Sequence, residues 1–515
     1  MNFIEEIIEE YEDKGKLKFR FPPEPNGRGL HIGHAKAMCV SFGLAEKYGA
    51  PCNLRMDDTN PLAESESNVE AILKDVEWLG FEWDGDVKRA SSYLSRLALH
   101  ATELVSNGKA YFDTSTSEEI AAAKGTPTTP GTNTPDRNNS IDRNIELWND
   151  FMGGNLKGVL RAKIDMAHTN MLMRDPVIFR WIDNYGPYPM YDFAHPLSDF
   201  FEGITHSLCT LEFEVHREFY EWVLDNLVTI GTRPRQIEFS RLNMSHTITS
   251  KRKINSMIEA GIVSGWDDPR LPTISGLRAR GYTPSSIREF CDRIGVTKFN
   301  GISDYAVLES ILREELNKSS SRLMVVLDPL EVEIANITEP IKVTVDNNPE
   351  DESAGSRELY VTSKIWIERD DFRVEANRKY HRLKTGGIVR LKGGVVIECV
   401  GHEEDSDGNI AKVNCVMIEA PEKVKGTIHW VGSESESIEV KDYRDLFLAK
   451  EPGKETGDFL DDLNKDSLVV YNAKAERSAV DAEVGSRVQF LRKGYYIKTL
   501  DGYNKTVGLR SSFKD

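Results

Sequence analysis

The sequence predicts an α/β amino-terminal part followed by an all-β carboxy-terminal part. The chain has 515 residues, which is too long for one hydrophobic core and predicts three or four domains. Strand and helix patterns alternate over the first 90 residues. After Leu323, short runs rich in valine, isoleucine, threonine and aromatic residues are broken by Asn-Pro, Gly-Gly and Asp-Gly pairs, which predicts strands joined by tight turns.

The first predicted elements are a strand at 17–21, a turn at 22–27, a helix at 33–48 and a strand at 51–56. Apolar residues at helical spacing predict a further helix at 69–79. A strand, a turn rich in proline and glycine, and a helix follow one another, so the helix begins at the turn. The amides and the dipole at a helix start favour an anion.

Two segments far apart in the chain carry groups that suit a polyphosphate. Leu30-His31-Ile32-Gly33-His34 puts two histidines around a glycine, and Ile248-Thr249-Ser250-Lys251-Arg252 puts two cations on a loop rich in serine and threonine. A phosphoryl or nucleotidyl transition state gathers negative charge on its non-bridging oxygens. The two segments are therefore predicted to supply donors to a polyphosphate from two directions.

The stretch 91–190 interrupts the α/β pattern. A loop at 124–139 is rich in glycine, threonine, proline and asparagine, and we expect it to lie on the surface with almost no regular structure. It is either a linker, which its position favours, or a hairpin that contacts a substrate. Strand patterns return at 159–164 and 188–193, and a helix pattern covers 216–227.

The pattern is helical from 253 to 317 and changes at a boundary near 317–322. The β-rich remainder predicts one or two small barrels. No internal repeat is apparent in the sequence.

The composition argues against several classes of protein. There is no run of about 18 apolar residues, so no membrane span is expected, and the acidic start Met1-Asn2-Phe3-Ile4-Glu5-Glu6 predicts no signal peptide. The six cysteines form no Cys-x-x-Cys pair, which argues against a zinc site or a disulfide framework and predicts the cytosol. The net charge of −18 decides nothing about nucleic acid, because a local basic face is what matters.

Five segments, in order over about 250 residues, carry a resemblance to a known family. They are Arg20-Phe21-Pro22-Pro23-Glu24-Pro25-Asn26-Gly27, Leu54-Arg55-Met56-Asp57-Asp58-Thr59-Asn60-Pro61, Tyr188-Pro189-Met190-Tyr191-Asp192-Phe193, Gly203-Ile204-Thr205-His206-Ser207-Leu208-Cys209-Thr210 and Trp266-Asp267-Asp268-Pro269-Arg270. With them the chain resembles the glutaminyl-tRNA synthetases, of the glutamyl/glutaminyl subfamily of class I aminoacyl-tRNA synthetases. The resemblance covers almost the whole chain, and five ordered segments are a strong signal where one His-x-Gly-His is weak.

The resemblance implies a Rossmann-type nucleotide-binding catalytic domain in two halves, at 1–90 and 188–252. It implies an inserted acceptor-stem-binding domain at 91–187, a helical subdomain at 253–320 and two anticodon-binding β-barrels at 321–515. It also implies a two-step reaction that begins only after tRNA has bound. Glutamine and ATP give an aminoacyl-adenylate and pyrophosphate, and the 2′-hydroxyl of the terminal adenosine of tRNA(Gln) then takes the acyl group.

The resemblance also assigns the ATP site. His31 and His34 would donate to the phosphates, and Lys251 would act as a mobile point charge while pyrophosphate leaves. The residues implied to bind ATP are Pro23, Glu24, Asn26, Gly33, His34, Arg241, Leu242 and Lys251. Magnesium is expected with the phosphates, no carboxylate cluster announces a dedicated metal site, and no zinc is expected.

The implied amino-acid pocket contains Arg20, Asp57, Tyr191, Cys209 and Gln236. Glutamate enzymes of this superfamily place an arginine where this sequence has Cys209. A buried carboxylate there would lack a partner, at a cost of several kcal/mol, so glutamine is the predicted substrate. The alternatives are that Cys209 is an ordinary buried cysteine and that Asp57 is a strand-end carboxylate in a turn.

By resemblance the carboxy-terminal half reads the anticodon, where cations and amides contact splayed bases and phosphates. The candidates are Arg322, Lys379, His381, Arg382, Lys392, Gln489 and Arg492. Three of them depart from the family, which has glutamine, lysine and arginine at positions 379, 381 and 392.

Other departures affect specific expectations. The turn Asn26-Gly27-Arg28-Gly29-Leu30 is one residue longer than in the family, which either moves His31 or is absorbed by Gly29. Thr249 replaces a methionine, and the stretch Arg180 to Tyr188 is shorter than in relatives. Val215 and Pro127 stand at positions that contact the acceptor stem.

The function that the resemblance implies is that of a glutamine–tRNA ligase, expected to be a monomer that binds no membrane. Two rival functions remain. One is a glutamate-accepting or relaxed enzyme of the same chemistry. The other is a tRNA-binding protein that has lost catalysis, for which the longer turn is the only hint.

Overall fold

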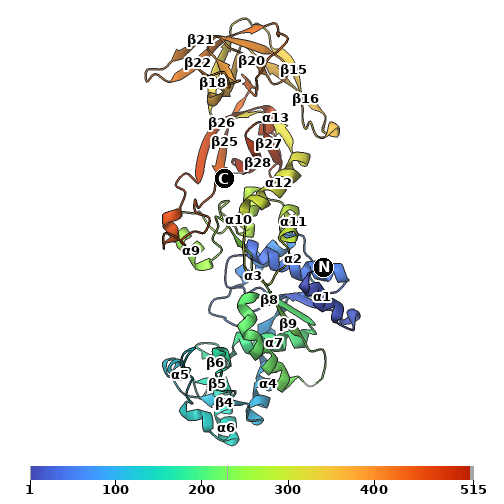
Figure 1. Cartoon of the computed structure of the whole chain (residues 1–515), viewed down its shortest axis with the longest axis vertical. Helices are drawn as coiled ribbons and strands as arrows, with labels where there is room; N and C mark the ends of the chain where they lie inside the picture. Colours follow the sequence, from blue (N-terminus) through green and yellow to red (C-terminus); the bar gives the residue numbers. More distant parts are fainter. Residues whose placement is uncertain (1, 229, 511–515) are drawn as a thin grey trace. The chain divides into compact units, whose positions relative to one another are not determined.

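A computed structural model describes residues 2–228 and 230–510 of the chain. It divides into two compact units, Met1–Asn243 with Cys291–Ser303, and Met244–Phe290 with Asp304–Asp515. Figure 1 labels their helices and strands along the chain. Within the described residues, no helix is both long enough and apolar enough to cross a membrane.

The first unit is built on parallel strands covered by helices. Its elements are α1 (Phe3–Glu10), β1 (Phe19–Phe21), α2 (Ile32–Tyr48), β2 (Cys52–Met56), α3 (Glu66–Trp78), β3 (Lys88–Arg89), α7 (Tyr191–Glu202), β8 (His206–Thr210), α8 (Arg217–Leu227) and β9 (Arg235–Phe239). All the pairings are parallel, β1 with β2, β2 with β3, and β8 with β9. The Thr205 amide donates to the Lys18 carbonyl at 3.0 Å, which places β8 beside β1. The resulting order, β3-β2-β1-β8-β9, is that of a Rossmann-type sheet, as predicted.

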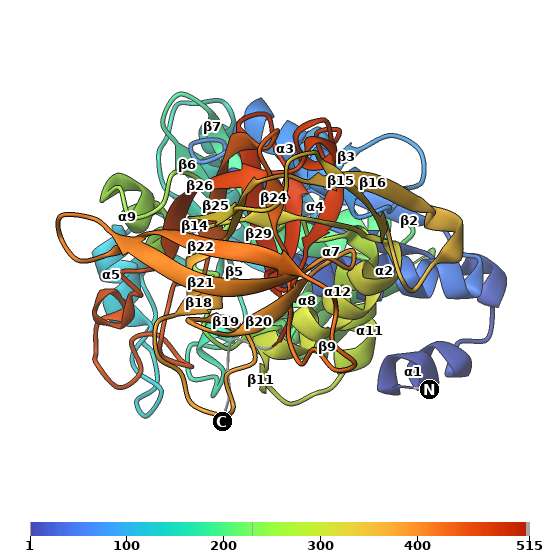
Figure 2. The ribbon, with the colours of Figure 1, turned by 90° about the horizontal axis from the view of Figure 1, so that it is seen from above.

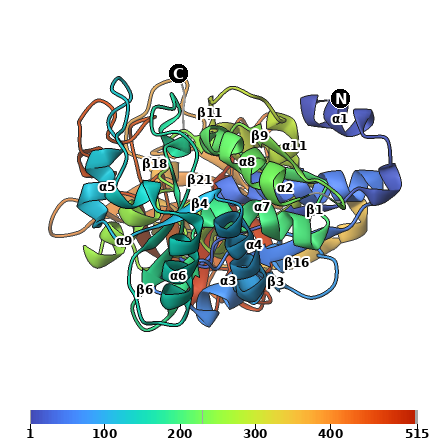
Figure 3. The same ribbon diagram turned by 90° about the horizontal axis from the view of Figure 1, so that it is seen from below.

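The segment between β3 and α7 forms an antiparallel sheet. It contains α4 (Leu94–Ser106), β4 (Ala110–Asp113), α5 (Ser117–Ala123), α6 (Ile141–Met152), β5 (Val159–Ala162), β6 (Val177–Ile182) and β7 (Gly186–Pro189), and the strands pair in the order β4-β5-β6-β7. Figure 3 shows α4 and α6 side by side. The Trp148 ring fills the core beneath them, 5.6 Å from Phe151 and 5.3 Å from Phe179 between centroids.

The predicted strand at 188–193 is wrong in its second half. β7 ends at Pro189, Met190 is the extended residue before the helix, and α7 begins at Tyr191. Phe193, Ala194 and Leu197 recur at helical spacing and are at most 1% exposed. A six-residue window is too short to show this period, because the second buried turn lies outside it.

The expectation of an almost structureless loop at 124–139 is also wrong. Thr126 and Thr129 exchange backbone hydrogen bonds of 3.1 and 3.2 Å, and a short 3₁₀ helix covers Pro135–Asn138. Nη1 of the buried Arg174 donates to the carbonyls of Lys124, Thr126 and Thr129 at 2.7, 2.9 and 2.9 Å. A guanidinium 50 residues away in sequence therefore shapes this hairpin, and its exposed tip carries Pro127.

The helices of the second unit precede its sheets. They are α9 (Lys251–Glu259), α10 (Ile274–Arg280) and α12 (Tyr305–Ser319), and a short α13 (Arg477–Val480) lies among the strands. α11 (Pro284–Ile294) and the strand pair β10 (Asn243–Met244) and β11 (Ile302–Ser303) contain residues of both units. α12 ends at Ser319 and the first strand of the β-rich part begins at Ser321. The domain limits predicted from sequence stay predictions.

Two seven-stranded sheets make up most of the second unit. The first runs β12 (Ser321–Leu323), β27 (Arg487–Phe490), β28 (Gly494–Lys498), β29 (Gly502–Gly508), β25 (Glu436–Tyr443), β26 (Leu468–Ala475), β13 (Val325–Val326). The second runs β23 (Thr427–Ile428), β20 (Ile388–Leu391), β21 (Val396–Glu404), β22 (Ile410–Ile418), β14 (Pro329–Ile334), β17 (Lys364–Glu368), β24 (Val431–Gly432). Two strand pairs stand apart, β15 (Ile341–Asp346) with β16 (Ser356–Val361), and β18 (Phe372–Arg373) with β19 (Leu383–Lys384).

Each seven-stranded sheet closes on itself through continuous chain. β12 and β13, the two ends of the first sheet, are separated only by Met324, and β23 and β24, the ends of the second, only by His429 and Trp430. One stretch of chain thus joins both edges of each sheet, which is how a barrel removes its edge strands. The predicted pair of barrels is confirmed, and Figure 2 shows the long β21–β22 hairpin of the second one.

Replacing Arg174 with methionine should release the hairpin while keeping the buried volume. Three carbonyls would lose a charged donor, so we expect a loss of about 2 kcal/mol of stability and faster protease cleavage between residues 124 and 131. Limited proteolysis with mass spectrometry measures this. Arg143→Met, on an arginine 55% exposed on α6, is the control, and equal cleavage of the two variants would contradict the role given to Arg174.

His206 should make the protein less stable in acid. Its ring is buried and packs against Tyr11, with the ring centroids 5.2 Å apart, and burial lowers the pKa of His206 to about 4. An unfolded histidine titrates near 6.5, so between pH 6.5 and 4 the unfolded chain binds this proton more readily. Stability should fall through that window, by up to about 3 kcal/mol from this group. Calorimetry of His206→Gln should show a stability that depends less steeply on pH in this window. The same slope in the parent and the variant would refute the role given to His206.

Candidate active site

The strand order β3-β2-β1-β8-β9 changes direction where β1 and β8 meet. In open sheets of this type the chain leaves neighbouring strands on opposite sides at this point, and ligands bind at the carboxyl ends. β1 leads through the turn into α2, and β8 leads into a 3₁₀ helix at Leu211–His216. The residues predicted to bind the amino-acid substrate, and the two histidines predicted to bind ATP, lie on or next to these elements and β2, α7 and β9.

The hydrogen bonds at the start of α2 determine which ring nitrogen of each histidine is the acceptor. Nδ1 of His31 accepts from the Gly33 amide at 3.1 Å, and Nδ1 of His34 accepts from the His31 amide at 3.1 Å. In a neutral imidazole whose Nδ1 accepts, the proton is on Nε2. The ring centroids lie 3.8 Å apart, with the ring planes tilted by 31°. Both rings thus lie together at a helix N-terminus, where backbone amides favour a phosphate.

Gly33 allows this arrangement. A Cβ on Gly33 would lie 2.9 Å from Cε1 of His31 and 3.8 Å from the Leu242 carbonyl oxygen. The ring of His31 therefore folds back over a position where only glycine fits. The same distances show that the first turn of α2 lies against the segment after β9, so the structure brings together two segments predicted to bind ATP.

That Gly29 absorbs the extra residue of the turn before α2 stays a prediction. Gly29 has φ of +126°, which a residue with a side chain rarely adopts. The Leu30 amide then donates to Asp75 Oδ2 at 2.9 Å, so the chain is fixed directly before His31. Pro23 is buried, with its carbonyl accepting from the Asp57 amide at 3.0 Å.

Of the other residues of this unit that are predicted to bind ATP, three are exposed and one, Leu242, is buried. Glu24 and Asn26 are exposed, and Asn26 Nδ2 donates to Glu24 at 2.5 Å. Leu242 is buried, while Arg241 is exposed and lies 3.7 Å from Glu212. A nucleotide base could therefore meet an apolar residue and a guanidinium side by side.

Arg20 is at the centre of a buried polar network. It is 1% exposed, its Nε lies 3.0 Å from Asp199, and Nη2 donates to the Ser207 hydroxyl at 2.8 Å. Nη2 also lies 2.8 Å from Nε2 of His195, and Nη1 donates to the Leu208 carbonyl at 2.6 Å. Its donors are directed at protein groups of α7 and β8.

Arg55 extends this network toward Asp57. The buried Arg55 guanidinium lies 2.9 Å from Asp57, 2.8 Å from Asp199 and 3.2 Å from Glu202. Burial opposes ionisation of Asp199, but the charges of Arg20, His195 and Arg55 outweigh it and hold the pKa of Asp199 well below its ordinary value. Asp57 is thus oriented by a guanidinium at the end of β2, as a carboxylate that binds an ammonium group should be.

The remaining pocket residues are neutral. The Tyr191 hydroxyl lies 3.3 Å from Nδ1 of His195, and Gln236 Nε2 donates to Glu238 at 2.9 Å and to the Phe213 carbonyl at 3.1 Å. Burial raises the pKa of the Cys209 thiol and of the Tyr191 hydroxyl. The parallel pairing of β8 with β9 puts Cys209 opposite Glu238.

The expectation that no guanidinium faces Cys209 stays a prediction. Arg20 and Arg217 both lie near enough to act electrostatically on the thiol. Each, however, is paired with a carboxylate, Arg20 with Asp199 and Arg217 with Glu238 at 3.0 Å. The sequence could not show this because the partners come from separate strands and helices. The charges near the thiol are present but balanced.

Several residues of this network were missed by the sequence analysis. Tyr191, His195 and Asp199 are spaced by four residues and so share one face of α7. That spacing was the available signal, although the strand predicted at 188–193 concealed it. Ser207 and Arg55 carried no signal of their own.

Lys251 lies in the second unit, as the first residue of α9. Lys251, Arg252 and Lys253 fill the first turn of the helix, and the preceding Ser250 forms no side-chain cap. A helix N-terminus and a group of cations both attract an anion. That Lys251 meets the two histidines at one phosphate stays a prediction.

The residues predicted to bind the anticodon all lie in the second unit. Positions 379, 381, 382 and 392 are exposed. Arg492 is exposed too, and its guanidinium donates to both oxygens of Asp371 at 2.7 Å. By contrast Arg322 and Gln489 are buried, and Arg322 donates to Asn348 and Asn317. These two must be uncovered before they can reach a base.

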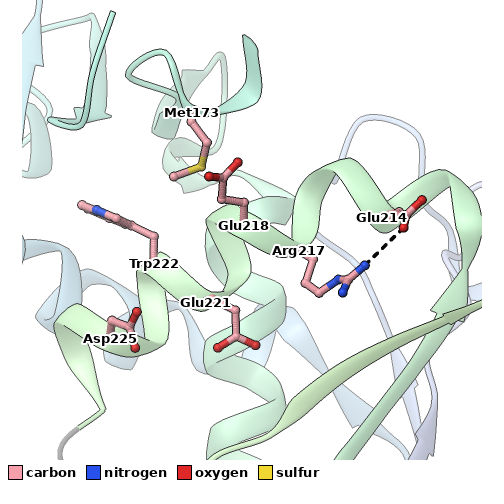
Figure 4. A pocket seen from close by; sticks show the side chains of 7 residues that line it. All are labelled: Met173, Glu214, Arg217, Glu218, Glu221, Trp222 and Asp225. Atoms are coloured by element: carbon pink, nitrogen blue, oxygen red, sulfur yellow. Dashed lines mark hydrogen bonds and ion pairs between the residues drawn. The ribbon is translucent and has the colours of Figure 1, made fainter. Parts of the chain in front are cut away.

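A hollow on the outer side of α8 contains no predicted ATP or amino-acid residue. Figure 4 shows the side chains that line it, Met173, Glu214, Arg217, Glu218, Glu221, Trp222 and Asp225. Arg233 lies 2.5 Å from Glu221 and 2.8 Å from Asp225, and His168 lies 3.2 Å from Glu218. Its acidic groups are thus balanced by partners within the unit.

Comparison with known proteins covers nearly the whole chain. The family model for the catalytic domain of tRNA synthetases class I (E and Q) matches residues 16–318. Two models for anti-codon binding domains of the same class match residues 320–418 and 427–499.

Curated relatives match over their full length. Proteins named glutamine–tRNA ligase from Vibrio parahaemolyticus and Shigella boydii are 46% and 47% identical, over 99% of this chain and 97% and 98% of theirs. One from Escherichia coli K12 is 47% identical over the same shares as the second. A solved structure of a glutamate tRNA ligase from Elizabethkingia meningosepticum, in complex with its amino acid, has a TM-score of 0.47 at 20% identity, over 59% of this chain and 70% of that one. The chain belongs to the class I tRNA synthetases of the E and Q group.

Proposed function

We propose that this protein is a glutamine–tRNA ligase. The observation that carries the proposal is the 46–47% identity to proteins of that name over 99% of the chain. The arrangement of the first unit supports it, because a nucleotide-type helix start and a pocket with balanced charges lie on one sheet. The inactive alternative is disfavoured because Lys251 and both histidines, His31 and His34, are present.

In the proposed first step, a carboxylate oxygen of glutamine attacks the α-phosphorus of ATP. An oxygen–phosphorus bond forms, the bond to the β-phosphate bridge breaks, and pyrophosphate leaves with the electron pair. Nε2–H groups of His31 and His34 and the ammonium of Lys251 stabilise the charge on the phosphate oxygens. In the second step the 2′-hydroxyl of the terminal adenosine of tRNA(Gln) attacks the acyl carbon, and AMP leaves.

We further propose that Asp57 binds the substrate ammonium and that Tyr191, Cys209 and Gln236 face the side-chain amide. Arg20 would give a donor to the amide oxygen only by exchanging one of its protein partners. Because Arg20 and Arg217 are already paired, a glutamate side chain would add an unbalanced charge at considerable cost. This supports glutamine over the glutamate-accepting alternative.

The other partners follow from the same proposal. Magnesium would enter with the ATP phosphates and supply charge neutralisation there; among the described residues, no group of three or more histidine, cysteine, aspartate or glutamate side chains could hold a metal ion. The anticodon would meet the exposed cations of the second unit, with Val215 and Pro127 near the acceptor stem. We propose a monomer that acts in the cytosol.

Lys251→Ala should reduce tRNA-dependent ATP–pyrophosphate exchange by at least 100-fold, about 2.7 kcal/mol of transition-state stabilisation. Lys253→Ala is the matched control, since Lys253 lies in the same turn with its Nζ 4.8 Å from the Phe459 ring centre. We expect that control to stay within threefold of the parent. A Lys251→Ala rate within threefold of the parent would exclude the proposed role.

Cys209→Arg should weaken the preference for glutamine. The parent should favour glutamine over glutamate by at least about 100-fold in kcat/KM, and the added guanidinium should lower that ratio by giving a carboxylate a partner. Aminoacylation of one tRNA pool with each amino acid measures both ratios. Cys209→Ser should keep the parental ratio, and comparable parental kcat/KM for both amino acids would defeat the pocket argument.

A further inference from the structure

Lys36 is a buried cation for which the site described above gives no use. It lies on α2 and is 5% exposed. Lysine is almost never buried unless it is paired. Within the described residues its Nζ has one hydrogen-bond partner, the Ser240 hydroxyl oxygen at 3.2 Å, and no carboxylate at ion-pair distance.

This placement is costly for folding. A buried ammonium loses its hydration, and one neutral hydroxyl does not replace it. Burial accordingly lowers the pKa of Lys36, opposed only by the nearby Cys291 thiol. A methionine of similar length would fill the same space without this cost, so the fold alone does not call for a lysine here.

The partner of Lys36 is itself held in one orientation. The Thr297 hydroxyl donates to the Phe299 carbonyl at 3.0 Å, so in the 3.0 Å contact between Ser240 and Thr297 the Ser240 hydroxyl is the donor. The lone pairs of Ser240 are then left to accept from Lys36. The Ser240 amide also donates to the Thr297 carbonyl at 2.8 Å, which fixes the backbone of this residue.

Ser240 directly precedes the two residues of this segment that the nucleotide site requires, Arg241 and Leu242. Lys36 follows Gly33 by three positions and so shares its face of α2. A Cβ on Gly33 would lie 3.8 Å from the Leu242 carbonyl. The same helix face thus lies close to the segment at Gly33 and is hydrogen-bonded to it at Lys36.

We propose that Lys36 is a positioning residue of the nucleotide site, whose ammonium holds Ser240 and thereby keeps Arg241 and Leu242 against the first turn of α2. The inference rests on the proposed function, because it takes the bound nucleotide from there. Lys36 acts through Ser240, and the groups that meet the nucleotide are those of the segment and of the helix start.

The test compares Lys36→Met and Ser240→Ala with the parent. The equilibrium Kd for ATP, measured by titration calorimetry, and the KM for ATP in pyrophosphate exchange should both rise about tenfold. The KM for glutamine should stay within twofold. The melting temperature of Lys36→Met should be unchanged or higher, because a costly buried charge is gone.

Lys47→Met is the control on the same helix. Lys47 is 54% exposed and lies 2.8 Å from Glu5, so its replacement should leave both KM values and the Kd for ATP within twofold of the parent. Should Lys36→Met fail to fold, Ser240→Ala carries the same comparison, since it removes the acceptor and leaves the lysine.

Two results would overturn the inference. One is an ATP Kd within twofold of the parent in both variants. The other is a lower melting temperature with equal rises in both KM values, which is what a merely structural role predicts. A parent protein that binds ATP but shows no glutamine-dependent exchange would refute the proposed function and leave the Kd comparison standing, whereas a parent that binds no ATP would refute both.

Discussion

The buried carboxylate of Asp199 is the interaction on which the first unit depends. It receives Arg20 from β1 and Arg55 from β2, and it also bonds the Ser207 hydroxyl of β8 at 2.6 Å and the Tyr220 hydroxyl of α8 at 3.0 Å. One side chain of α7 therefore ties together the three central strands and a second helix. Two guanidiniums without it would be uncompensated buried charges, which is far more costly than any single hydrogen bond.

This network also bears on the predicted amino-acid pocket. Arg20 and Arg55 are neutralised by carboxylates inside the fold, and the predicted pocket residues Tyr191, Cys209 and Gln236 carry hydroxyl, thiol and amide groups. The same carboxylates orient Asp57 through Arg55. The same charges thus stabilise the fold and set the charge near the predicted pocket. A change that turns one of these guanidiniums toward a ligand also leaves its carboxylate partner buried without a cation.

The two helix starts linked to phosphate chemistry create positive potential in different ways. α2 begins with two histidine rings whose Nδ1 atoms accept from backbone amides, so the capping bonds leave the proton of a neutral ring on Nε2. α9 instead accumulates three cations where the dipole is already positive. Both helix starts are predicted to meet phosphate, the first through histidines and the second through cations.

The sequence by itself determined the alternation of strands and helices around the first turn, the change to a β-rich part near residue 320, and the residue types of the site. These follow from local periodicity and from motifs that lie within a few residues of one another. Local patterns failed where distant groups decide the conformation. The hairpin at 124–139 is shaped by Arg174, and the helix at Tyr191 is selected by burial of its apolar face against the insert.

Only the tertiary structure decided the electrostatics of the site. The guanidiniums of Arg20 and Arg217 are paired with carboxylates from α7 and β9. The ammonium of Lys36 has a single hydroxyl partner among the described residues because of the side chains that pack around it. Closure of the first barrel likewise depends on pairing between strands more than 100 residues apart, such as β12 with β27. Charge balance, burial and strand pairing depend on which residues are close in space. The order of residues along the chain does not specify this.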